Sequence, residues 1–600
     1  MEQNYWSAVL TRRQLTRRRL LSGAAGVATG GAALSLIGCG GGGGDDAGVE
    51  GDASGLLGKA EDTTSKAIPG GSLPDYYTGD YTTLDPITNV SSITRGYYPH
   101  TYTMLFKSGL STTKTPGTAE ITGDSAQSWE MSEDGTQLTV KVRPNHKFDQ
   151  RPPTNGRAMT SADIKWSWDQ FEGRNFFATD LANSRNPDAP VESVTAPDMN
   201  TLVFKMASPS GIIVDLFSLH FFYVMPQLES FDFQMDMRGA GPYFLKEYRP
   251  SESVTFSKNP DWYESPRPYF DTIKRSLLPE YATGLAQFVA GNIWTWDARA
   301  TDLIPTKRAN LDMLMLPVPN VSRSASFYTF SKRDGSIWKD VRLRRALSMS
   351  MERDLLIHAL NNLNEFETAG LPISTYWNSH VAAGQPEWLD PKGTGLGEGA
   401  KYFKFDLAEA KKLVEAAGLQ TPVKSTIADY SDRTPERFKE TLTIAQQITQ
   451  AGVFNMEAEP LLYGSSWRAA RQSGGMGFDG LVHHSGNSNP TGQQLPAFFT
   501  PNGSNTSSAI PIPNVTEAVY KLRGLTDAAQ REALVHEIQK QLALEWPMMT
   551  QPGDAPLFTL QWPWLRNSNV FKTINPDTAR LFAWMWYDKD LHERSSEGSK

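Results

Sequence analysis

The 600-residue sequence contains a single cysteine, Cys39, so it cannot form an internal disulfide or a metal site built from several cysteines. Basic residues are also outnumbered, because 58 Lys and Arg face 66 Asp and Glu, which gives a formal charge of −8. Proteins that bind nucleic acid usually carry a basic domain or stripe. The charge therefore argues against nucleic acid as a partner.

Long apolar runs are scarce as well. Beyond the first 38 residues, no segment approaches the roughly 18 uninterrupted apolar residues typical of a membrane-spanning helix. Hydrophobic residues still make up 39% of the chain, which is enough for a large core. Because single cores stop growing at roughly 250–300 residues, we expect two or more lobes.

Residues 1–38 are typical of an export signal. An arginine-rich start precedes a weakly apolar stretch, rich in Gly and Ala, that runs from Leu20 to Gly38. Arg17 and Arg18 lie in a segment that resembles the twin-arginine export motif. The alternative is a transmembrane anchor, which the glycine content disfavours.

Directly after this segment, Leu36-Ile37-Gly38-Cys39 resembles a bacterial lipobox, which implies cleavage before Cys39 and acylation of its sulfur. Residues 39–67 are rich in Gly, Asp, Ser and Thr, a composition that predicts a flexible tether. We therefore expect a lipid anchor, a tether and a globular body in that order.

The body alternates short strand-like runs with amphipathic helices, which predicts an α/β or α+β fold. Thr160, followed by Asp163, has the spacing of a helix cap. The predicted strands are residues 137–143 and 253–257, and the predicted helices are residues 160–171, 406–417 and 527–545.

Catalytic motifs are not found. The sequence has no G-x-x-x-x-G-K-[ST], no H-E-x-x-H and no G-x-S-x-G. Among nine histidines only His483 and His484 are adjacent, and neighbours in sequence usually point in different directions, so a shared metal is not implied. We expect no catalytic residue, no cofactor and no metal site, which argues against an enzyme.

Several segments, in this order along the chain, together resemble the family 5 extracellular solute-binding proteins, the oligopeptide, dipeptide and nickel receptors of ABC importers. The segments are GGSL at 70–73, TLDP at 83–86, AQSWEMSEDG at 126–135, TSADI at 160–164, GAGPY at 239–243, KNPDWY at 258–263, DVRLRRAL at 340–347, FD at 405–406 with AKKLVEAAG at 410–418, and EWP at 545–547. The resemblance covers roughly residues 70–565.

The resemblance implies an α/β fold with two lobes and a hinge, of the periplasmic-binding-protein type (class II), with an extra subdomain in lobe one. By position, lobe one would comprise residues 68–318 plus 552–600, and lobe two residues 319–551. Such proteins close around a ligand by a hinge motion.

The resemblance also implies a monomeric, extracytoplasmic receptor that delivers a peptide-like or other small solute to an ABC permease and its ATPase. One acyl chain binds membranes only marginally, so a stable anchor implies more than one chain on Cys39. Two alternatives remain: an exported hydrolase acting on peptides or glycans, and a sensory binding protein with the same fold.

Ligand specificity is where the sequence departs from the family pattern. Peptide-binding members place an aspartate for the ligand's α-amino group in the stretch that resembles residues 478–490, and the matching residue here is Asn487. An amide cannot neutralise a buried ammonium. We therefore expect a blocked peptide, an oligosaccharide or a metal chelate rather than a free peptide, with Asn487, His484 and Ser485 near the ligand.

Aromatic residues supply the other ligand-binding candidates. Trp377 lies in a stretch that resembles the family's cleft-facing loop, although lobe-two core is an equally good interpretation. Tyr97 and Tyr98 precede a helix-like segment of lobe one, and we expect one of them, Tyr98, to face the cleft.

Overall fold

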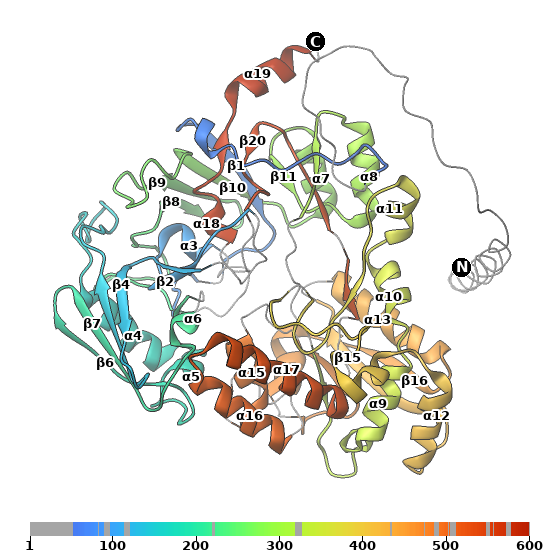
Figure 1. Ribbon diagram of the computed structural model, residues 1–600. Coiled ribbons are helices and arrows are strands. Elements are labelled where there is room, and N and C mark those ends of the chain that lie inside the picture. Colours follow the sequence, from blue (N-terminus) through green and yellow to red (C-terminus); the bar gives the residue numbers. More distant parts are fainter. Residues whose placement is uncertain are drawn as a thin grey trace, which may run out of the picture. The chain divides into compact units, whose positions relative to one another are not determined.

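The computed structural model describes residues 52–600 apart from residues 82, 89–96, 113–119, 219–221, 319–326, 384, 433–434, 473–474, 485–490, 502, 504–511, 548–551, 556, 572–577 and 599–600. All of them belong to one compact unit that spans Gly48–Lys600. Its helices and strands are labelled in Figure 1.

The first sheet of lobe one has the strand order β1-β10-β9-β8, in which β1 runs parallel to β10 and the other neighbours are antiparallel. The strands are β1 (Ser72–Tyr77), β8 (Tyr243–Arg249), β9 (Ser253–Lys258) and β10 (Thr272–Leu277). Leu73 and Ile273 are register partners, and both are buried in the core of this lobe. The predicted strand at 253–257 is confirmed.

A subdomain of lobe one is built on the antiparallel sheet β4-β5-β7-β6. Its elements are β2 (Phe106–Ser108), β3 (Ile121–Gly123), β4 (Ala126–Met131), β5 (Gln137–Val142), α4 (Ser161–Arg174), α5 (Ala178–Leu181), β6 (Val191–Asp198), β7 (Thr201–Met206) and α6 (Ile213–Phe217). The predicted cap is present, because Asp163 Oδ2 accepts a hydrogen bond from the Thr160 backbone N–H at 2.9 Å. The subdomain shares one continuous core with the first sheet, through residues such as Leu138 and Trp168.

A third sheet, β11-β19-β12, joins distant parts of the sequence. Its strands are β11 (Thr295–Trp296), β12 (Leu314–Pro317) and β19 (Phe558–Gln561). The remaining elements of this lobe are α3 (Tyr98–Thr101), α7 (Tyr281–Val289), α8 (Ala300–Ala309), β20 (Leu565–Arg566), α18 (Thr578–Leu581), β21 (Trp586–Tyr587) and α19 (Lys589–Gly598). The C-terminal strand β19 therefore forms one sheet with strands β11 and β12, which lie more than two hundred residues earlier in the chain.

Lobe two has a mixed sheet in the order β13-β17-β15-β16, with β15 parallel to both neighbours and β13 antiparallel to β17. Its elements are β13 (Phe327–Phe330), α9 (Val341–Met349), α10 (Arg353–Leu360), α11 (Leu363–Ala369), β14 (Tyr376–Trp377), α12 (Leu407–Ala416), β15 (Val423–Tyr430), α13 (Pro435–Gln450), β16 (Phe454–Leu461), α14 (Arg468–Gln472), β17 (Leu481–His484), α15 (Thr491–Phe499), α16 (Pro513–Gly524), α17 (Ala528–Glu545) and β18 (Gly553–Asp554), with short turns at Ile337–Lys339, Gly397–Phe403 and Tyr463–Trp467. A separate core of this lobe surrounds Trp338 and Trp546. The predicted helices at 406–417 and 527–545 are confirmed.

The two places where the chain crosses between the lobes are adjacent. Strands β12 and β19 pair with Pro317 opposite Phe558, and the Val318 backbone N–H donates to the Leu557 carbonyl at 2.8 Å. A small core at this point combines Met315 of lobe one with Ile357 and Phe366 from α10 and α11. The crossing therefore has its own packing, which is what a hinge of fixed position requires.

The tether prediction is wrong for residues 52–67. Thr63 donates from its backbone N–H and its hydroxyl to Asn567 Oδ1, at 2.9 and 2.8 Å, and Gly58 N–H donates to the Met315 carbonyl at 2.9 Å. Thr63 is buried. Local composition suggested a linker because the partners lie hundreds of residues away in the sequence, where no local pattern reveals them. Residues 39–51 lie outside the described part of the chain.

A prediction concerns the acid side of the stability curve. His380 is fully buried, and burial lowers its pKa to about 4, opposed by the hydrogen bond between Nε2 and the Trp546 carbonyl at 2.7 Å. Between pH 6.5 and 4 the unfolded chain therefore binds more protons than the folded one, so the free energy of unfolding falls as the pH falls. The loss from this histidine approaches about 3 kcal/mol near pH 4, at about 1.4 kcal/mol per pKa unit.

His380→Asn keeps a hydrogen-bond donor and removes the titration. We expect chemical denaturation at several pH values to give a flatter acid slope for this variant than for the parent protein. His358→Asn, at a partly exposed position, serves as the control for replacing a histidine by asparagine. Equal slopes for His380→Asn and the parent protein would contradict the assignment.

Candidate functional site

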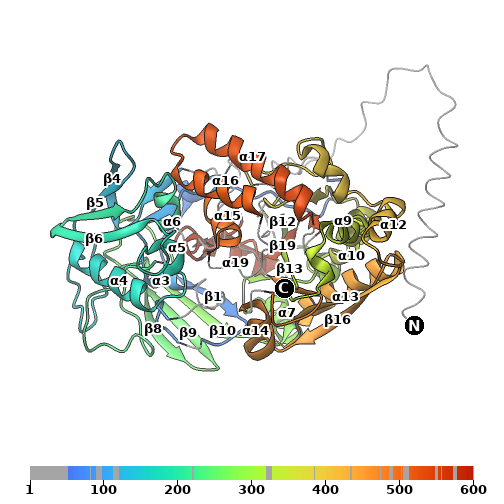
Figure 2. The ribbon, with the colours of Figure 1, turned by 90° about the horizontal axis from the view of Figure 1, so that it is seen from below.

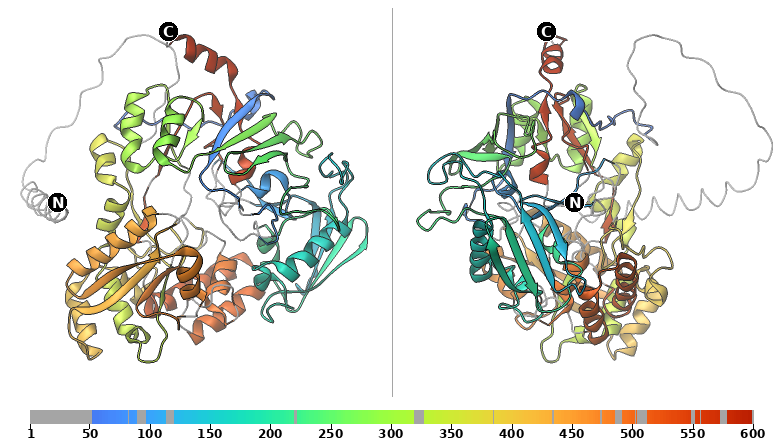
Figure 3. Two further views of the ribbon diagram at one scale, coloured as in Figure 1. Left: turned by 180° about the vertical axis from the view of Figure 1, so that it is seen from behind. Right: turned by 60° about the vertical axis from the view of Figure 1, so that its left-hand side comes forward.

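The two lobes touch where the subdomain of lobe one meets helices α16 and α17 of lobe two. The Gly211 backbone N–H donates to the Arg523 carbonyl, and Arg531 Nη1 donates to the Gly211 carbonyl, both at 3.0 Å. Tyr520 Oη donates to Asp188 Oδ2 at 3.0 Å, and Arg523 Nη1 donates to the Asp188 carbonyl. Figure 2 and Figure 3 show these orange-red helices beside the teal α5–α6 segment.

This contact depends on a glycine. A Cβ atom at position 211 would lie 1.9 Å from the Leu525 carbonyl oxygen, which is far inside van der Waals contact. Because the obstructing atom is backbone, no side-chain rotation can relieve the clash. Gly211 therefore allows the two backbones to approach closely enough for the hydrogen bonds between the lobes.

A pocket of about 750 Å³ of empty space lies between the lobes at this contact. Lobe one contributes residues of β2, β3 and α6, and lobe two contributes residues 385–387, the start of α15 and residues of α16 and α17. The charged side chains that line it are Asp215, Glu387 and Arg531. Its position between two lobes is typical of a small-molecule site.

The electrostatics of this pocket are unbalanced. Arg531 Nη1 lies 3.7 Å from Asp215 Oδ2, and Thr491 Oγ1 donates to Glu387 Oε1 at 2.9 Å. Burial raises the pKa of Asp215; the positive charge of Arg531 opposes this rise and the negative charge of Glu387 adds to it. The site thus disfavours the ionised form of Asp215 when nothing is bound.

A second pocket, of about 400 Å³ of empty space, adjoins the first. The two pockets share Ile212 and Gly492 in their linings. Ser210 lines the second pocket; it is 2% exposed, and its hydroxyl has no hydrogen-bond partner among the described residues. A buried polar atom of this kind is costly unless a ligand or water satisfies it.

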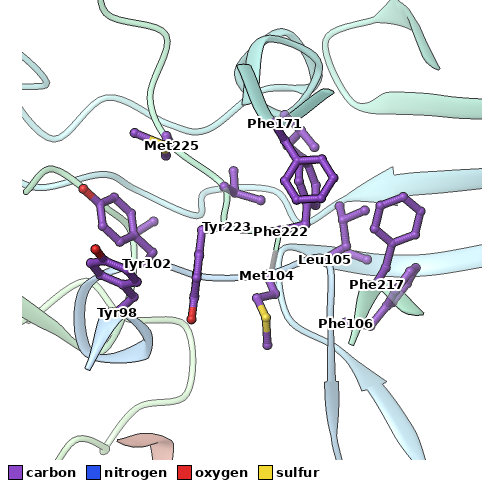
Figure 4. Packing of buried hydrophobic residues seen from close by; sticks show 14 of the residues in the cluster. Tyr98, Tyr102, Met104, Leu105, Phe106, Phe171, Phe217, Phe222, Tyr223 and Met225 are labelled. Atoms are coloured by element: carbon purple, nitrogen blue, oxygen red, sulfur yellow. The ribbon is translucent and has the colours of Figure 1, made fainter. Parts of the chain in front are cut away.

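Tyr98 does not face the cleft in this structure. It is 1% exposed in the core of lobe one, where its ring contacts the rings of Tyr102 and Tyr223 (Figure 4). Its hydroxyl donates to the backbone carbonyl of Asp85 at 3.2 Å. The neighbouring Tyr97 is half-buried, and the guanidinium of Arg275 lies 3.8 Å from its ring centre.

Trp377 connects the lobe-two core to the small core at the crossing and is not among the lining residues of either pocket. It is half-buried in β14 and packs against both the lobe-two core and the small core at the crossing. Its Nε1–H donates to Asp354 Oδ1 at 2.9 Å, and Lys392 Nζ lies 5.3 Å from its ring centre. This position favours a role at the hinge.

The predicted ligand segment is described only at its edges. Ser485 and Asn487 lie outside the described residues, as do Cys39, Arg17 and Arg18. The backbone of His484 pairs with Phe327 at the end of β17. Thr491, the residue that follows this segment, lines the larger pocket.

Sequence reasoning missed Asp215, Glu387 and Arg531. One signal was present, because Asp215 is the only charged residue in the apolar run Ile212–Phe217. Charged side chains are rarely fully buried unless they are paired, so a carboxylate in such a run indicates a polar or charged neighbour. Nothing local marked Glu387 or Arg531, since their role arises only when the lobes meet.

Within the described ranges, no group of three or more His, Cys, Asp or Glu side chains is placed to hold a metal ion. In the same part of the chain, no helix combines the length and apolar character needed to span a bilayer.

The fold defines the class of protein, a two-lobed binding protein. A structure of the Helicobacter pylori periplasmic binding protein DppA in complex with the peptide STSA is 17% identical, with a TM-score of 0.68 over 87% of this chain and 99% of that one. A structure of AgaA with agropinic acid, from A. tumefacien R10, is 16% identical, with a TM-score of 0.68 over 86% and 99%. The predicted fold class is confirmed.

The family follows from the sequence profile of the bacterial extracellular solute-binding proteins, family 5 Middle, which matches residues 120–506. The match covers more than half of the chain, so the chain belongs to this family, as the resemblance predicted. The oligopeptide-binding protein AppA of Bacillus subtilis is 25% identical over 187 residues, or 28% of this chain and 33% of that protein. The chain thus matches only a third of that relative's length.

The contact between the lobes leads to a prediction. Gly211→Ala should separate the backbones at positions 211 and 525 and break the hydrogen bonds there. We expect amide hydrogen exchange in peptides covering residues 205–218 and 520–531 to speed up about ten-fold or more, which corresponds to about 1.4 kcal/mol.

Gly173→Ala is the matched control, because a Cβ atom at that position would meet nothing within 4 Å. It should leave exchange at the lobe contact unchanged. If Gly211→Ala also exchanged like the parent protein, the close approach would not hold the lobes together.

Proposed function

We propose that this protein is a lipid-anchored, extracytoplasmic receptor that captures a small solute between its lobes and delivers it to an ABC permease. The observation that carries the proposal is the pocket between the lobes, whose charged and polar side chains come from both of them. A solute held there would contact lobe one and lobe two at once. Its binding energy would therefore favour the closed arrangement over an open one.

The mechanism needs binding groups and a hinge, and it needs no covalent chemistry. The crossing at Val318 and Leu557 keeps the lobes connected while their other contacts change. Hydrogen bonds such as that from Tyr520 to Asp188 join the lobes without any ligand. A bound solute adds to them, and the closed receptor is the form that a permease would recognise. We propose accordingly that the protein is not an enzyme and acts as a monomer.

The export signal and the lipobox support anchoring. Arg17 and Arg18 would direct export of the folded chain, and acylated Cys39 would hold it at the outer face of the membrane. An anchor raises the effective concentration of the receptor near its permease. Thr63 is hydrogen-bonded to Asn567 of the body, so residues around Thr63 do not belong to the proposed tether.

The segment that contains Asn487, Ser485 and His484 is proposed to contact the solute from the side of lobe two. The support is its position, because it joins β17 to Thr491, which lines the pocket. Relatives and structural neighbours bind diverse solutes: AppA is an oligopeptide-binding protein, and the neighbours hold the peptide STSA or agropinic acid. Peptides, blocked peptides, oligosaccharides and chelates therefore all belong in a screen.

Reversible binding without turnover is the first expected outcome. Stabilisation by a ligand follows mass action and reaches about 2.7 kcal/mol at a concentration one hundred times the Kd. We expect calorimetry to give one ligand per chain and mass spectrometry to recover the ligand unchanged. Release of a cleaved product would support a hydrolase instead.

Asn487→Ala tests the sequence assignment within the same experiment. Loss of one ligand hydrogen bond should weaken binding by about three- to ten-fold, since such a bond contributes about 0.5–1.5 kcal/mol. An exposed residue of lobe two, Glu517→Gln on α16, is the control. Unchanged affinity in Asn487→Ala would remove this residue from the site.

The anchor is tested in cells of the source organism. Cys39→Ser should release the exported protein from the membrane fraction, because no thiol remains for acylation. Arg17→Lys with Arg18→Lys should instead leave a precursor inside the cell. A mature N-terminus other than Cys39, or membrane retention of Cys39→Ser, would contradict the proposal.

A further inference from the structure

The first described residues of the chain form a short segment at the crossing between the lobes. The Gly58 backbone N–H donates to the carbonyl of Met315 in β12, and the Ala53 backbone N–H donates to the carbonyl of Gly370 at the end of α11, both at 2.9 Å. Met315 belongs to lobe one, whereas Gly370 follows a helix of lobe two. Residues 52–58 therefore bind a backbone group of each lobe.

The segment also lies along an open edge of the sheet at the crossing. Strand β12 is the last strand in the order β11-β19-β12, so only one of its edges pairs with β19. Leu57 forms a parallel bridge with Met315 at the other edge. An unpaired strand edge presents free backbone N–H and C=O groups, and a short segment placed there can bind them. The segment thus continues the sheet through which both passages of the chain run.

Apolar contacts hold the segment in place. Leu56 and Leu57 are partly buried and pack against the small core at the crossing. That core contains Met315 and Leu560 of the sheet together with Phe366 of α11. Because both lobes contribute to this core, burial of the two leucines favours the arrangement in which it stays intact.

Helices α10 and α11 connect the segment with the rest of lobe two. Leu356 of α10 is buried in the lobe-two core, and the adjacent Ile357 is buried in the small core at the crossing. A rotation of lobe two therefore displaces α11 and Gly370, whereas Met315 stays with lobe one. The two hydrogen bonds of the segment end on parts of the molecule that move apart when the lobes separate.

The segment has little slack. Five residues separate the contact of Ala53 from that of Gly58, so the chain between them spans at most about 18 Å when fully extended. A turn shortens this reach, because the Asp52 carboxylate accepts hydrogen bonds from the backbone N–H groups of Ser54 and Leu57, at 2.8 and 3.2 Å. A large separation of the two partner carbonyls would therefore break one of the two contacts.

We propose that residues 52–58 act as a hinge strap, a third connection between the lobes that restricts how far lobe two rotates away from lobe one. The other two connections are the covalent passages of the chain. The strap keeps the ligand-free protein within a narrow range of lobe separations, so less conformational freedom is lost when the lobes close on a solute. The inference concerns the hinge alone and depends neither on the identity of the solute nor on acylation of Cys39.

The test measures the distance between the lobes by pulsed electron paramagnetic resonance on the ligand-free protein. Spin labels are attached at Lys246→Cys on β8 and Lys411→Cys on α12, two exposed positions in different lobes. Cys39→Ser removes the only native thiol. Deletion of residues 52–58 should broaden the distance distribution, because the third connection is lost. Deletion of residues 40–46 removes the same number of residues from the proposed tether and should leave the distribution unchanged.

Gly370→Ala tests the contact without removing residues. A Cβ atom at this position would lie 3.1 Å from the carbonyl carbon of Ala53, closer than ordinary contact, so the strap has to move away. We expect amide exchange at Ala53 and Gly58 to speed up about ten-fold, and the distance distribution to broaden as in the deletion.

Gly418→Ala is the matched control for Gly370→Ala. Each glycine follows a helix in a left-handed conformation, with φ of +80° at Gly418 and +87° at Gly370, so the backbone strain of an alanine is similar. A Cβ atom at Gly418 would meet nothing within 4 Å. Gly418→Ala should therefore leave both measurements unchanged.

Three results would overturn the proposal. Deletion of residues 52–58 could leave the distance distribution as narrow as in the parent protein, or deletion of residues 40–46 could broaden it equally. Gly370→Ala could leave exchange at Ala53 and Gly58 unchanged. Because Gly370→Ala keeps the chain intact, it carries the test if the deletion does not fold. Neither measurement involves a solute, so the receptor function stands or falls separately.

Discussion

The pairing of β12 with β19 is the constraint on which the architecture depends. Both passages of the chain between the lobes run through this pair, and Val318 and Leu557 continue it by a hydrogen bond of 2.8 Å. Lobes joined at one edge can change their separation elsewhere without unfolding. The contact at Gly211 and the pockets beside it are therefore the part of the interface that a ligand can control.

Elsewhere in the body, buried charged side chains form closer ion pairs than the charged side chains of the pocket do. Asp75 and Arg275, both nearly inaccessible, lie 2.6 Å apart, and Arg157 binds Asp163 at 2.6 Å. Those pairs neutralise each other within the fold. Asp215 has its nearest described cation at 3.7 Å and a second carboxylate in the same pocket. The charged groups of the pocket are thus partly exposed and less closely paired than the ion pair of Asp75 and Arg275.

Local elements could be predicted from the sequence, whereas the site could not. The strand at Gln137–Val142 and the helix after Thr160 follow from alternation and capping, which involve residues a few positions apart. The packing of Thr63 on Asn567 and the meeting of Asp215 with Arg531 span hundreds of residues. Tyr98 was expected in the cleft because tyrosine suits both cores and ligand sites, and only packing distinguishes these roles.

The strength of the contact between the lobes suits a receptor. The hydrogen bonds from Gly211, Tyr520, Arg523 and Arg531 each contribute about 0.5–1.5 kcal/mol net, so together they amount to a few kcal/mol. Loss of conformational freedom on closure opposes them. A differential binding energy of about 5.5 kcal/mol moves a two-state equilibrium from 1:99 to 99:1. A solute that contacts both lobes at once stabilises the closed arrangement by the difference between its binding energies to the two forms, so occupancy of the pocket can shift this equilibrium.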